Sequence, residues 1–199
     1  MSKIDLHPAI TALKRGDVIV YPTDTLYALG ADVFNEVAVK QIFKIKNRSF
    51  DIPLPVAVAS FDDIESIAFV NDATRRLAEH FLPGPLTLIL NKKGNISNIV
   101  TGGLSKVAVR IPKSDVALEL LSKFGPLIAT SANVHGMETP QDLKSIKKQF
   151  KDGDIAIYLD AGKLNGLPST IVDVTDKTTK IVREGIITKK DILGAIGHG

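Results

Sequence analysis

Two cations, Lys46 and Arg48, stand at the end of a run that is typical of an amphipathic helix over residues 35–46. If the chain is extended beyond that helix, side chains two residues apart point the same way, and nearby prolines favour extended backbone. Arginine binds phosphate through two parallel hydrogen bonds, and lysine binds it as a point charge. The pair could therefore hold a polyphosphate. The structural alternative is that cations stabilise a helix C-terminus, where the helix dipole is negative.

Hydroxyl and amide side chains follow two of the predicted strands. The Thr-Asp-Thr sequence at 23–25 comes directly after apolar residues 18–21, and Ser131 and Asn133 follow apolar residues 126–129. Loops at strand ends are where α/β proteins bind ligands, and small polar side chains let a ligand approach the backbone. Local turn chemistry is the alternative, because Thr and Asp also bond their own backbone.

Arg110, Ser169 and Arg183 are the remaining candidates for a polar site. Arg110 ends an otherwise apolar strand, so it needs an anionic partner, either an internal carboxylate or a substrate. Ser169 opens a predicted strand, and its hydroxyl could face the same cleft. Arg183 precedes Glu184. An exposed ion pair between these two neighbours is the alternative, and it would contribute little to stability.

Other familiar catalytic constellations are absent from the sequence. The chain has no cysteine, which excludes disulfides, zinc–thiolate sites and a cysteine nucleophile. It has no P-loop pattern, no Rossmann glycine fingerprint and no paired-histidine helix motif, and its four histidines stand in no recognisable triad. The sequence thus offers cations and hydroxyls but no evident nucleophile. We also predict no metal ligand from the protein.

Short apolar runs alternate with amphipathic stretches along the chain, which predicts an α/β fold. We expect strands at residues 18–21, 55–59, 86–90, 107–111, 126–129, 155–159, 170–174 and 180–183. We expect helices over residues 35–46 and 116–123, after a cap at Asn71 or Asp72, from Thr139-Pro140 onwards, and from Thr188. The polar segment 91–105, with three glycines, is predicted to be a mobile loop. Residues 1–199 are predicted to form one domain.

Composition excludes some classes of protein. Hydrophobic residues make up 44% and charged residues 24%, as in folded soluble proteins. A net charge of +3 is too small to establish nucleic-acid binding, although lysines at 144, 147, 148 and 151 on a predicted helix could either be solvated or touch RNA. We find neither a signal peptide nor an apolar run long enough to span a membrane, so we expect a cytoplasmic protein without membrane contact.

Taken together, these segments resemble the YrdC-like family over residues 16–187. Seven short motifs occur in the family's order: Pro22-Thr23-Asp24-Thr25 with Tyr27 and Leu29-Gly30, Lys46-x-Arg48, Pro83-Gly84-Pro85-Leu86-Thr87, Val109-Arg110-Ile111-Pro112, Ser131-Ala132-Asn133, Ser169-Thr170-Ile171-Val172-Asp173 and Arg183-Glu184-Gly185. Each motif alone is weak evidence for the family. Seven motifs in the family's order are hard to produce by chance, so the resemblance is specific.

The resemblance implies an open, twisted mixed α/β sheet with flanking helices around a positively charged cavity. It also implies a nucleotidyltransferase that joins L-threonine, bicarbonate and ATP into threonylcarbamoyl-AMP and releases pyrophosphate. The product would pass to a threonylcarbamoyl-transferase complex that modifies adenosine 37 of tRNA, and direct tRNA contact is left open. Mg²⁺ would arrive with ATP, held largely by phosphates and water.

The same resemblance implies roles for particular residues. Three would contact the threonine: Thr25, Arg110 and Ser169. Six would contact ATP: Lys46, Arg48, Ser131, Asn133, Thr139 and Arg183. Lys46 and Arg48 would also be catalytic, by stabilising the leaving pyrophosphate.

Some positions depart from the family's pattern. Asn47 and Ser49 flank Arg48 where Gly and Pro are common, Ile52 stands where Asn is frequent, Ala57 where many members have His, and Lys106 where Thr is frequent. These departures keep open a related adenylating enzyme with a different acid substrate. An RNA-binding module of the same fold is the other alternative. We further expect the loop at 91–105 to cover bound substrates.

Overall fold

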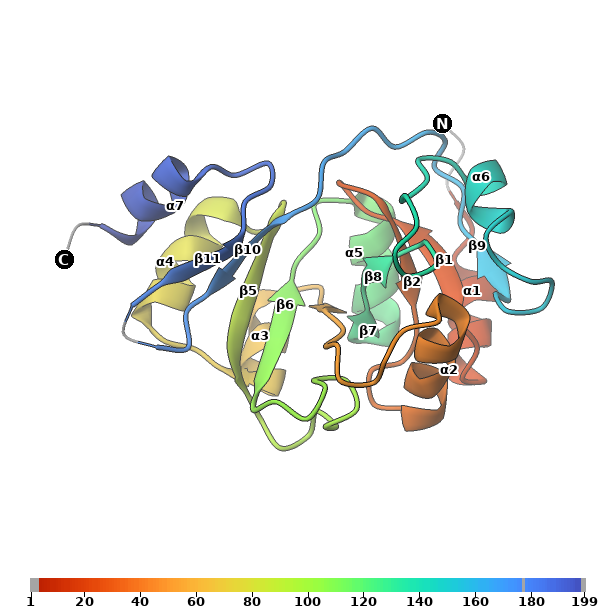
Figure 1. Ribbon diagram of the computed structural model, residues 1–199, viewed down its shortest axis with the longest axis horizontal. Coiled ribbons are helices and arrows are strands. Elements are labelled where there is room, and N and C mark those ends of the chain that lie inside the picture. The colour runs from red at the N-terminus through yellow and green to blue at the C-terminus, as the bar shows by residue number, and fades with distance from the viewer. Residues whose placement is uncertain (1–3, 177, 198–199) are drawn as a thin grey trace.

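The computed structural model describes residues 4–176 and 178–197, which form a mixed α/β protein (Figure 1). The helices are α1 (His7–Lys14), α2 (Glu36–Lys46), α3 (Phe61–Ile67), α4 (Asp72–Phe81), α5 (Asp115–Phe124), α6 (Leu143–Lys147) and α7 (Lys189–Ile196). The strands are β1 (Ile19–Pro22), β2 (Tyr27–Gly30), β3 (Val56–Ala57), β4 (Ala68–Phe69), β5 (Leu86–Lys92), β6 (Lys106–Arg110), β7 (Leu127–Ile128), β8 (Thr130–Ser131), β9 (Ile157–Tyr158), β10 (Thr170–Asp173) and β11 (Lys180–Arg183).

The described strands form two sheets instead of one. The smaller sheet has the order β8-β2-β1-β9, and the larger has the order β11-β10-β5-β6-β3-β7, with β4 added beside β5. Both contain parallel and antiparallel neighbours, so the predicted mixed character is confirmed. The sheets meet where β7 passes directly into β8, and a hydrogen bond from the Ile128 amide to the Ala31 carbonyl joins them.

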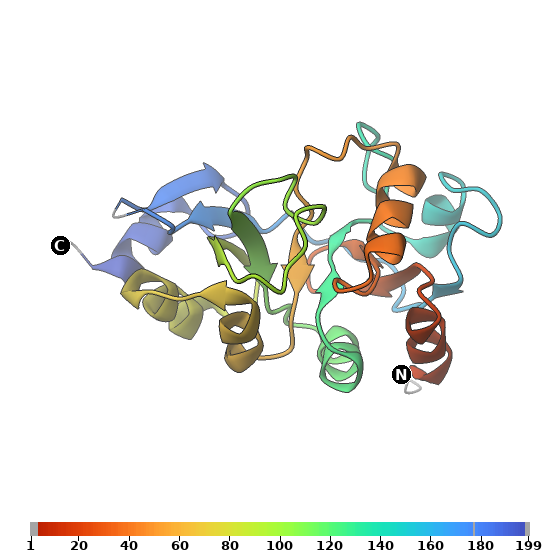
Figure 2. The same cartoon turned by 90° about the horizontal axis from the view of Figure 1, so that it is seen from below.

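Helices cover one side of both sheets. Figure 2 shows α1, α5, α3 and α4 along one face, with α2 on the opposite face. The main core cluster contains side chains of both sheets, including Val20, Leu29, Leu88 and Val109, all fully buried. Strands β1 and β2 are buried at every position, whereas β6 and β10 alternate buried with partly exposed positions.

Helix α2 begins and ends at asparagines. The Asn35 side chain accepts hydrogen bonds from the amides of Val37 and Ala38, at 3.1 and 3.2 Å. Asn47 follows the last residue in a left-handed conformation, with φ 50° and ψ 47°. Asparagine tolerates that conformation better than most residues, so it terminates the helix. The chain therefore turns after Lys46, and the predicted extended backbone between Lys46 and Arg48 is wrong.

A second prediction, the helix start at Thr139-Pro140, is also wrong. Helix α6 begins at Leu143, and the Asp142 carboxylate caps it by accepting from the Ser145 amide at 2.8 Å. Residues 139–141 instead belong to an irregular segment, whose Gln141 carbonyl accepts from the Leu164 amide.

The segment at 91–105 is anchored to the rest of the molecule. Ile96 and Val100 are buried in the main core cluster, and the Val100 carbonyl accepts from the Leu54 amide at 2.8 Å. Ser97 bonds Glu36 at the start of α2. None of the described residues that line the central cavity comes from this segment. In this structure the segment therefore does not form cavity wall, and its role in covering bound substrates stays a prediction.

Candidate active site

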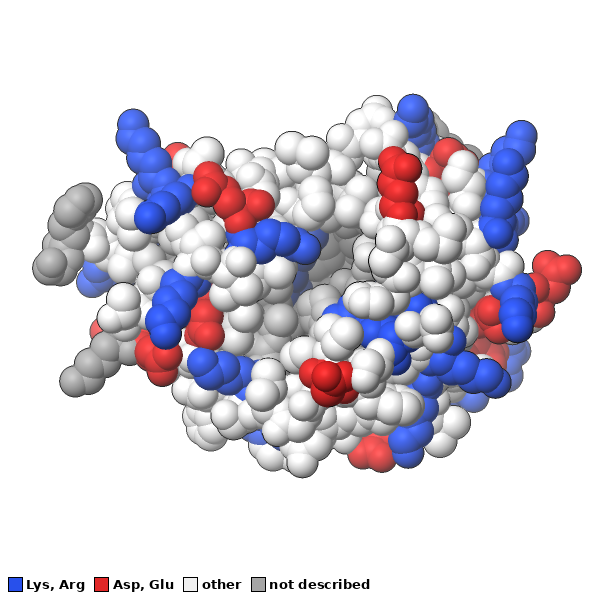
Figure 3. All heavy atoms as spheres, in the orientation of Figure 1, with Lys and Arg blue, Asp and Glu red and all other residues white. Residues whose placement is uncertain are grey.

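A cavity of about 390 Å³ lies between the two sheets, and Figure 3 shows the molecule hollowed there, with basic side chains on either side. Of the nine predicted site residues, seven line the cavity: Thr25, Arg48, Arg110, Ser131, Thr139, Ser169 and Arg183. The other two, Lys46 and Asn133, are buried beneath the wall that Ser131 forms. The fold therefore brings together side chains that are far apart in the sequence.

The cavity lining is cationic and rich in hydroxyls. Arg48, Arg110 and Arg183 line it, and none of the described lining residues is a carboxylate. Hydroxyls come from eight residues: Thr23, Thr25, Tyr27, Thr87, Thr130, Ser131, Thr139 and Ser169. Fixed positive charge with neutral donors attracts an anionic ligand and binds it in defined orientations. Within the described chain, no group of three His, Cys, Asp or Glu side chains could hold a metal ion.

Lys46 anchors the loop that follows β8. Its ammonium donates to the carbonyls of Ser131 and Asn133, both at 2.6 Å, and to Asn133 Oδ1 at 3.2 Å. Only 1% of the residue is exposed. Burial lowers the pKa of Lys46 to about 7, and the charge of Arg48 acts in the same direction. The three oxygen acceptors favour the ammonium form, because hydrogen bonds to a charged form stabilise it.

Arg48 reaches the cavity from a backbone turn. Its Nη2 donates to the Pro53 carbonyl at 2.7 Å, and its Nε lies 3.4 Å from the Ile52 carbonyl. Burial lowers its pKa, but a guanidinium remains charged in proteins. These two carbonyls fix the plane of the guanidinium, so its other N–H groups keep a defined direction toward the cavity.

The loop at 131–139 is held by a network of amide hydrogen bonds. Asn133 Oδ1 accepts from the Ser131 hydroxyl at 2.5 Å, and its Nδ2 donates to the carbonyls of Val134 and Met137 at 3.0 and 2.7 Å. Asn133 therefore fixes the loop from within, while Ser131 and Thr139 form cavity wall.

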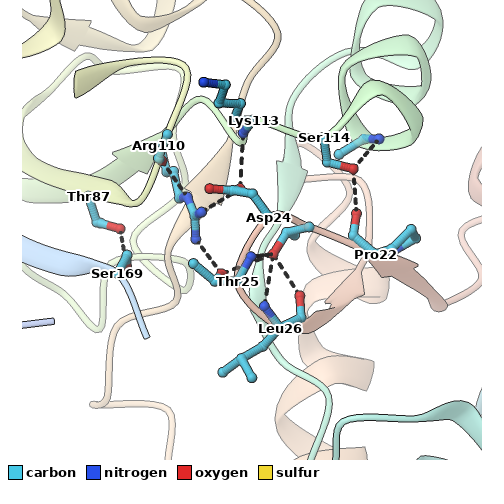
Figure 4. A network of polar contacts seen from close by, with 12 residues as sticks. Pro22, Asp24, Thr25, Leu26, Thr87, Arg110, Lys113, Ser114 and Ser169 are labelled. Atoms are coloured by element: carbon cyan, nitrogen blue, oxygen red, sulfur yellow. Dashed lines mark hydrogen bonds and ion pairs between the residues drawn. The ribbon is translucent and has the colours of Figure 1, made fainter. Parts of the chain in front are cut away.

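Arg110 lies at the centre of the network in Figure 4. Its guanidinium donates to the Gly84 carbonyl at 3.0 Å, to Thr25 Oγ1 at 2.8 Å and to Asp24 Oδ1 at 2.5 Å. Asp24 is thus the internal carboxylate that the sequence left open as one alternative. Burial lowers the pKa of Arg110, and the charge of Asp24 opposes that effect.

Ser169 and Arg183 form the wall that belongs to the larger sheet. Ser169 Oγ lies 2.8 Å from Thr87 Oγ1, and Arg183 donates to the Ser169 carbonyl through Nη2 at 2.9 Å and Nε at 3.2 Å. Arg183 therefore bonds the Ser169 backbone, and the alternative, a pair with the neighbouring Glu184, is not among the described ion pairs. Thr87 was not predicted as a site residue, although its motif was recognised.

A connection over residues 160–168 links the two sheets, and Figure 1 shows it crossing above them. Its last residue, Pro168, lines the cavity. Tyr27 ties the connection down, because its hydroxyl donates to the Gly162 carbonyl at 2.7 Å and accepts from the Ala161 amide at 2.9 Å. Gly166 lies directly on the backbone of Thr25: a Cβ there would stand 2.1 Å from the Thr25 carbonyl oxygen. The sequence pattern carried no sign of this contact.

Gly166→Ala should therefore destabilise the protein. The added methyl overlaps rigid backbone, and overpacking of this kind costs about 1–3 kcal/mol, or about 2–10 °C in melting temperature for a chain of this size. The matched control is Gly94→Ala, where an added Cβ meets nothing within 4 Å. Thermal melts of both variants provide the measurement, and equal melting temperatures would contradict the packing of Gly166 on Thr25.

The family model Sua5/YciO/YrdC, described as telomere recombination, matches residues 11–185. A protein of Pyrococcus abyssi named threonylcarbamoyl-AMP synthase is 37% identical over 189 residues, which are 94% of this chain and 55% of that protein. A Methanocaldococcus jannaschii protein named putative threonylcarbamoyl-AMP synthase is 40% identical and covers 87% of this chain and 82% of its own length. The chain thus spans about half of the first relative.

Two solved structures are similar in fold. P. abyssi Sua5 complexed with L-threonine superposes with a TM-score of 0.91 at 36% identity, over 95% of this chain and 56% of that one. E. coli YciO superposes with a TM-score of 0.85 at 29% identity, over 93% and 91%. No helix within the described residues is long and apolar enough to cross a membrane.

Proposed function

Because the chain belongs to the Sua5/YciO/YrdC family, we propose that it is a threonylcarbamoyl-AMP synthase, a nucleotidyltransferase that uses L-threonine, bicarbonate and ATP. The observation that carries the proposal is the cavity between the sheets, where three arginines and eight hydroxyl groups meet without a lining carboxylate. Such a cavity suits two anionic substrates lying side by side. In phosphoryl-type transfers an enzyme acts mainly by positioning the substrates and by neutralising the negative charges that repel one another.

The residues divide into two groups on this proposal. Thr25, Arg110 and Ser169 bind the threonine. Each of these residues is less than 10% exposed, and they line the cavity from both sheets. The nucleotide is bound by the remaining six predicted residues: Lys46, Arg48, Ser131, Asn133, Thr139 and Arg183. Lys46 and Asn133 act through the loop at 131–139, which they hold beneath the cavity wall.

The reaction has two bond-forming steps. The threonine amine nitrogen bonds the carbon of CO₂ derived from bicarbonate, loses a proton and becomes a carbamate. A carbamate oxygen then bonds the α-phosphorus of ATP while the bond to the bridging oxygen breaks, and the electron pair leaves with pyrophosphate. No side chain needs to act as a nucleophile. Arg48 stabilises the charge that develops on the leaving pyrophosphate, because its guanidinium is already fixed in direction.

Several finer features belong to the same proposal. Mg²⁺ accompanies ATP, and with no carboxylate among the described lining residues the phosphates and water would be its main ligands. Residues 1–199 act as one domain, which the shared core of the two sheets supports. The protein works in the cytoplasm and passes its product to a threonylcarbamoyl-transferase complex. The lysines of residues 144–151 offer a surface for tRNA contact.

A second candidate is a related adenylating enzyme with a different acid substrate. Ala57 favours this alternative, because it is buried in the cavity wall and its small side chain leaves room beside the threonine-binding residues. The likeness to YciO is compatible with either reading. Substrate dependence separates the two.

Pyrophosphate release should require ATP, L-threonine and bicarbonate together. The physical reason is that the attacking carbamate forms only from threonine and bicarbonate together, and none of the described lining residues is a carboxylate that could attack ATP in its place. The measurement is a coupled pyrophosphate assay in which each substrate is left out in turn. Turnover that does not depend on threonine but requires another amino acid would favour the second candidate. Absence of turnover with any acid would contradict both proposed functions.

A further inference from the structure

The guanidinium of Arg110 is held on three sides before any ligand binds. Its three hydrogen-bond partners come from different places in the fold: Gly84 before β5, and Asp24 and Thr25 in the turn between β1 and β2. Only 11% of the Arg110 side chain and 14% of the Asp24 side chain are exposed. The orientation of the cation is therefore set by the protein.

This arrangement leaves Arg110 with donors for a ligand. A guanidinium has five N–H groups, and three are used here. Within the described part of the chain, the second N–H of each terminal nitrogen has no acceptor. Arg110 lines the cavity, so a carboxylate there can accept from both terminal nitrogens.

Asp24 itself does not line the cavity among the described residues. Its Oδ1 accepts from Arg110 on the larger sheet and from the Lys113 amide, at 3.0 Å, in the segment that leads to α5. Asp24 belongs to the β1–β2 turn of the smaller sheet. One carboxylate thus joins the two walls of the cavity at the end where Arg110, Thr25 and Ser169 lie, as Figure 4 shows.

The negative charge of Asp24 weakens the Coulomb attraction between Arg110 and an anionic ligand. The Asp24–Arg110 pair has no net charge, so a substrate carboxylate gains less from Coulomb attraction than it would from an unpaired arginine. Binding must then depend on the direction of the two remaining N–H groups. A neutralised cation is useful in such a site only when its orientation matters more than its charge.

We propose that Asp24 is a positioning residue for the acid substrate. It orients the Arg110 guanidinium so that this group binds the substrate carboxylate, and it sets the distance between the two cavity walls beside Arg110. The proposal rests on the function proposed above, and it assigns Asp24 no contact with the substrate. It predicts that Asp24 is coupled to one chemical group of the ligand, the carboxylate.

The test compares two ligands that differ only in that group. Binding of L-threonine and of L-threoninol, the amino alcohol without the carboxylate, is measured by calorimetry with ATP present and bicarbonate left out. Wild-type protein should prefer threonine. In Asp24→Asn this preference should fall by roughly tenfold to a hundredfold, the scale of a charge-assisted hydrogen bond, while ATP affinity stays within about twofold.

The matched control is Asp173→Asn, which breaks the ion pair with Lys106 at 3.0 Å. This pair lies on the same sheet as Arg110 but outside the cavity lining. The ligand preference of Asp173→Asn should equal that of wild type. Asp24→Glu keeps the charge but displaces the guanidinium, so its preference should also fall, and this variant decides the matter if Asp24→Asn does not fold. Equal weakening of both ligands, or an unchanged preference in the folded variants, would overturn the proposal. Wild-type protein that binds no threonine would instead contradict the proposed function.

Discussion

Arg48→Lys should fold normally and lose about 99% of its turnover, the scale for removing one preorganised stabiliser of developing charge. The charge itself is retained in this variant. What is lost is the planar fork that the carbonyls of Ile52 and Pro53 hold in one plane beside the cavity. A lysine ammonium cannot reproduce two parallel hydrogen bonds to a phosphate.

The effect on stability should be small in comparison. Arg48 is half-buried, and its contacts with the protein are the two carbonyls, one of them at 3.4 Å. Their loss should change the free energy of unfolding by about 1 kcal/mol. Pyrophosphate release at saturating substrate concentrations and thermal melts measure the two quantities separately.

Arg15→Lys is the matched control, because Arg15 is exposed and its guanidinium pairs on the surface with Asp17 at 2.8 Å. Its turnover and melting temperature should equal those of wild type. If Arg48→Lys also turned over at the wild-type rate, the leaving group would be stabilised elsewhere, and the catalytic assignment of Arg48 would have to be abandoned.

The fold could be predicted where local pattern decides it. Short apolar runs predicted the strands around β1, β5, β6 and β10, because most positions of these strands are buried or half-buried. Strand β2 was missed because Tyr27–Gly30 is short and follows three turn-forming residues. Helices α1 and α3 were missed as well, although Ser60 caps α3 with a complete capping box.

The false helix start at Thr139 shows where local signals compete. Thr139, followed by Pro140, and Asp142 are both acceptable caps, and they stand only three positions apart. Tertiary contacts favour the second start, because the Gln141 carbonyl accepts from the Leu164 amide in the connection between the two sheets. Such a contact between distant segments leaves no trace in a local pattern.

The candidate site, too, was predicted only in part from the sequence. Residue types and motif order placed seven of nine residues on the cavity wall. The partners of buried charges could not be predicted, because Asp24 and Arg110, like Lys46 and Asn133, are more than 80 residues apart in the sequence. The sequence therefore predicted side chains that the fold brings to one cavity, but not that Lys46 is buried beneath the cavity wall.

Lys46→Met should cost both activity and stability. Methionine keeps the apolar stem but removes the ammonium, so the carbonyls of Ser131 and Asn133 lose this donor. Asn133 Oδ1 also loses it but still accepts from the Ser131 hydroxyl. An unsatisfied buried polar group costs about 1–3 kcal/mol. Because this loop carries Ser131 and Thr139 on the cavity wall, we also expect turnover to fall by about a hundredfold.

Lys44→Met is the matched control. Lys44 lies in the last turn of the same helix, and its side chain is exposed. Both substitutions remove a cation from the negative end of the helix dipole, which contributes at most about 1 kcal/mol. Only Lys46→Met removes buried hydrogen bonds. Equal stability and turnover in the two variants would mean that Lys46 merely complements the helix dipole.

The free energy of unfolding should depend on pH in a way that identifies the buried Lys46. Burial lowers its folded-state pKa to about 7, whereas an unfolded lysine titrates near about 10.4. Between these values the unfolded chain binds one more proton than the native protein, so the free energy of unfolding rises with pH by up to about 1.4 kcal/mol per unit. Below about pH 7 both states hold the proton, and this contribution is constant. Urea unfolding from pH 6 to 9 should therefore show wild type gaining stability over Lys46→Met only above about pH 7. A constant difference up to pH 9 would mean that the three oxygen acceptors keep Lys46 fully charged.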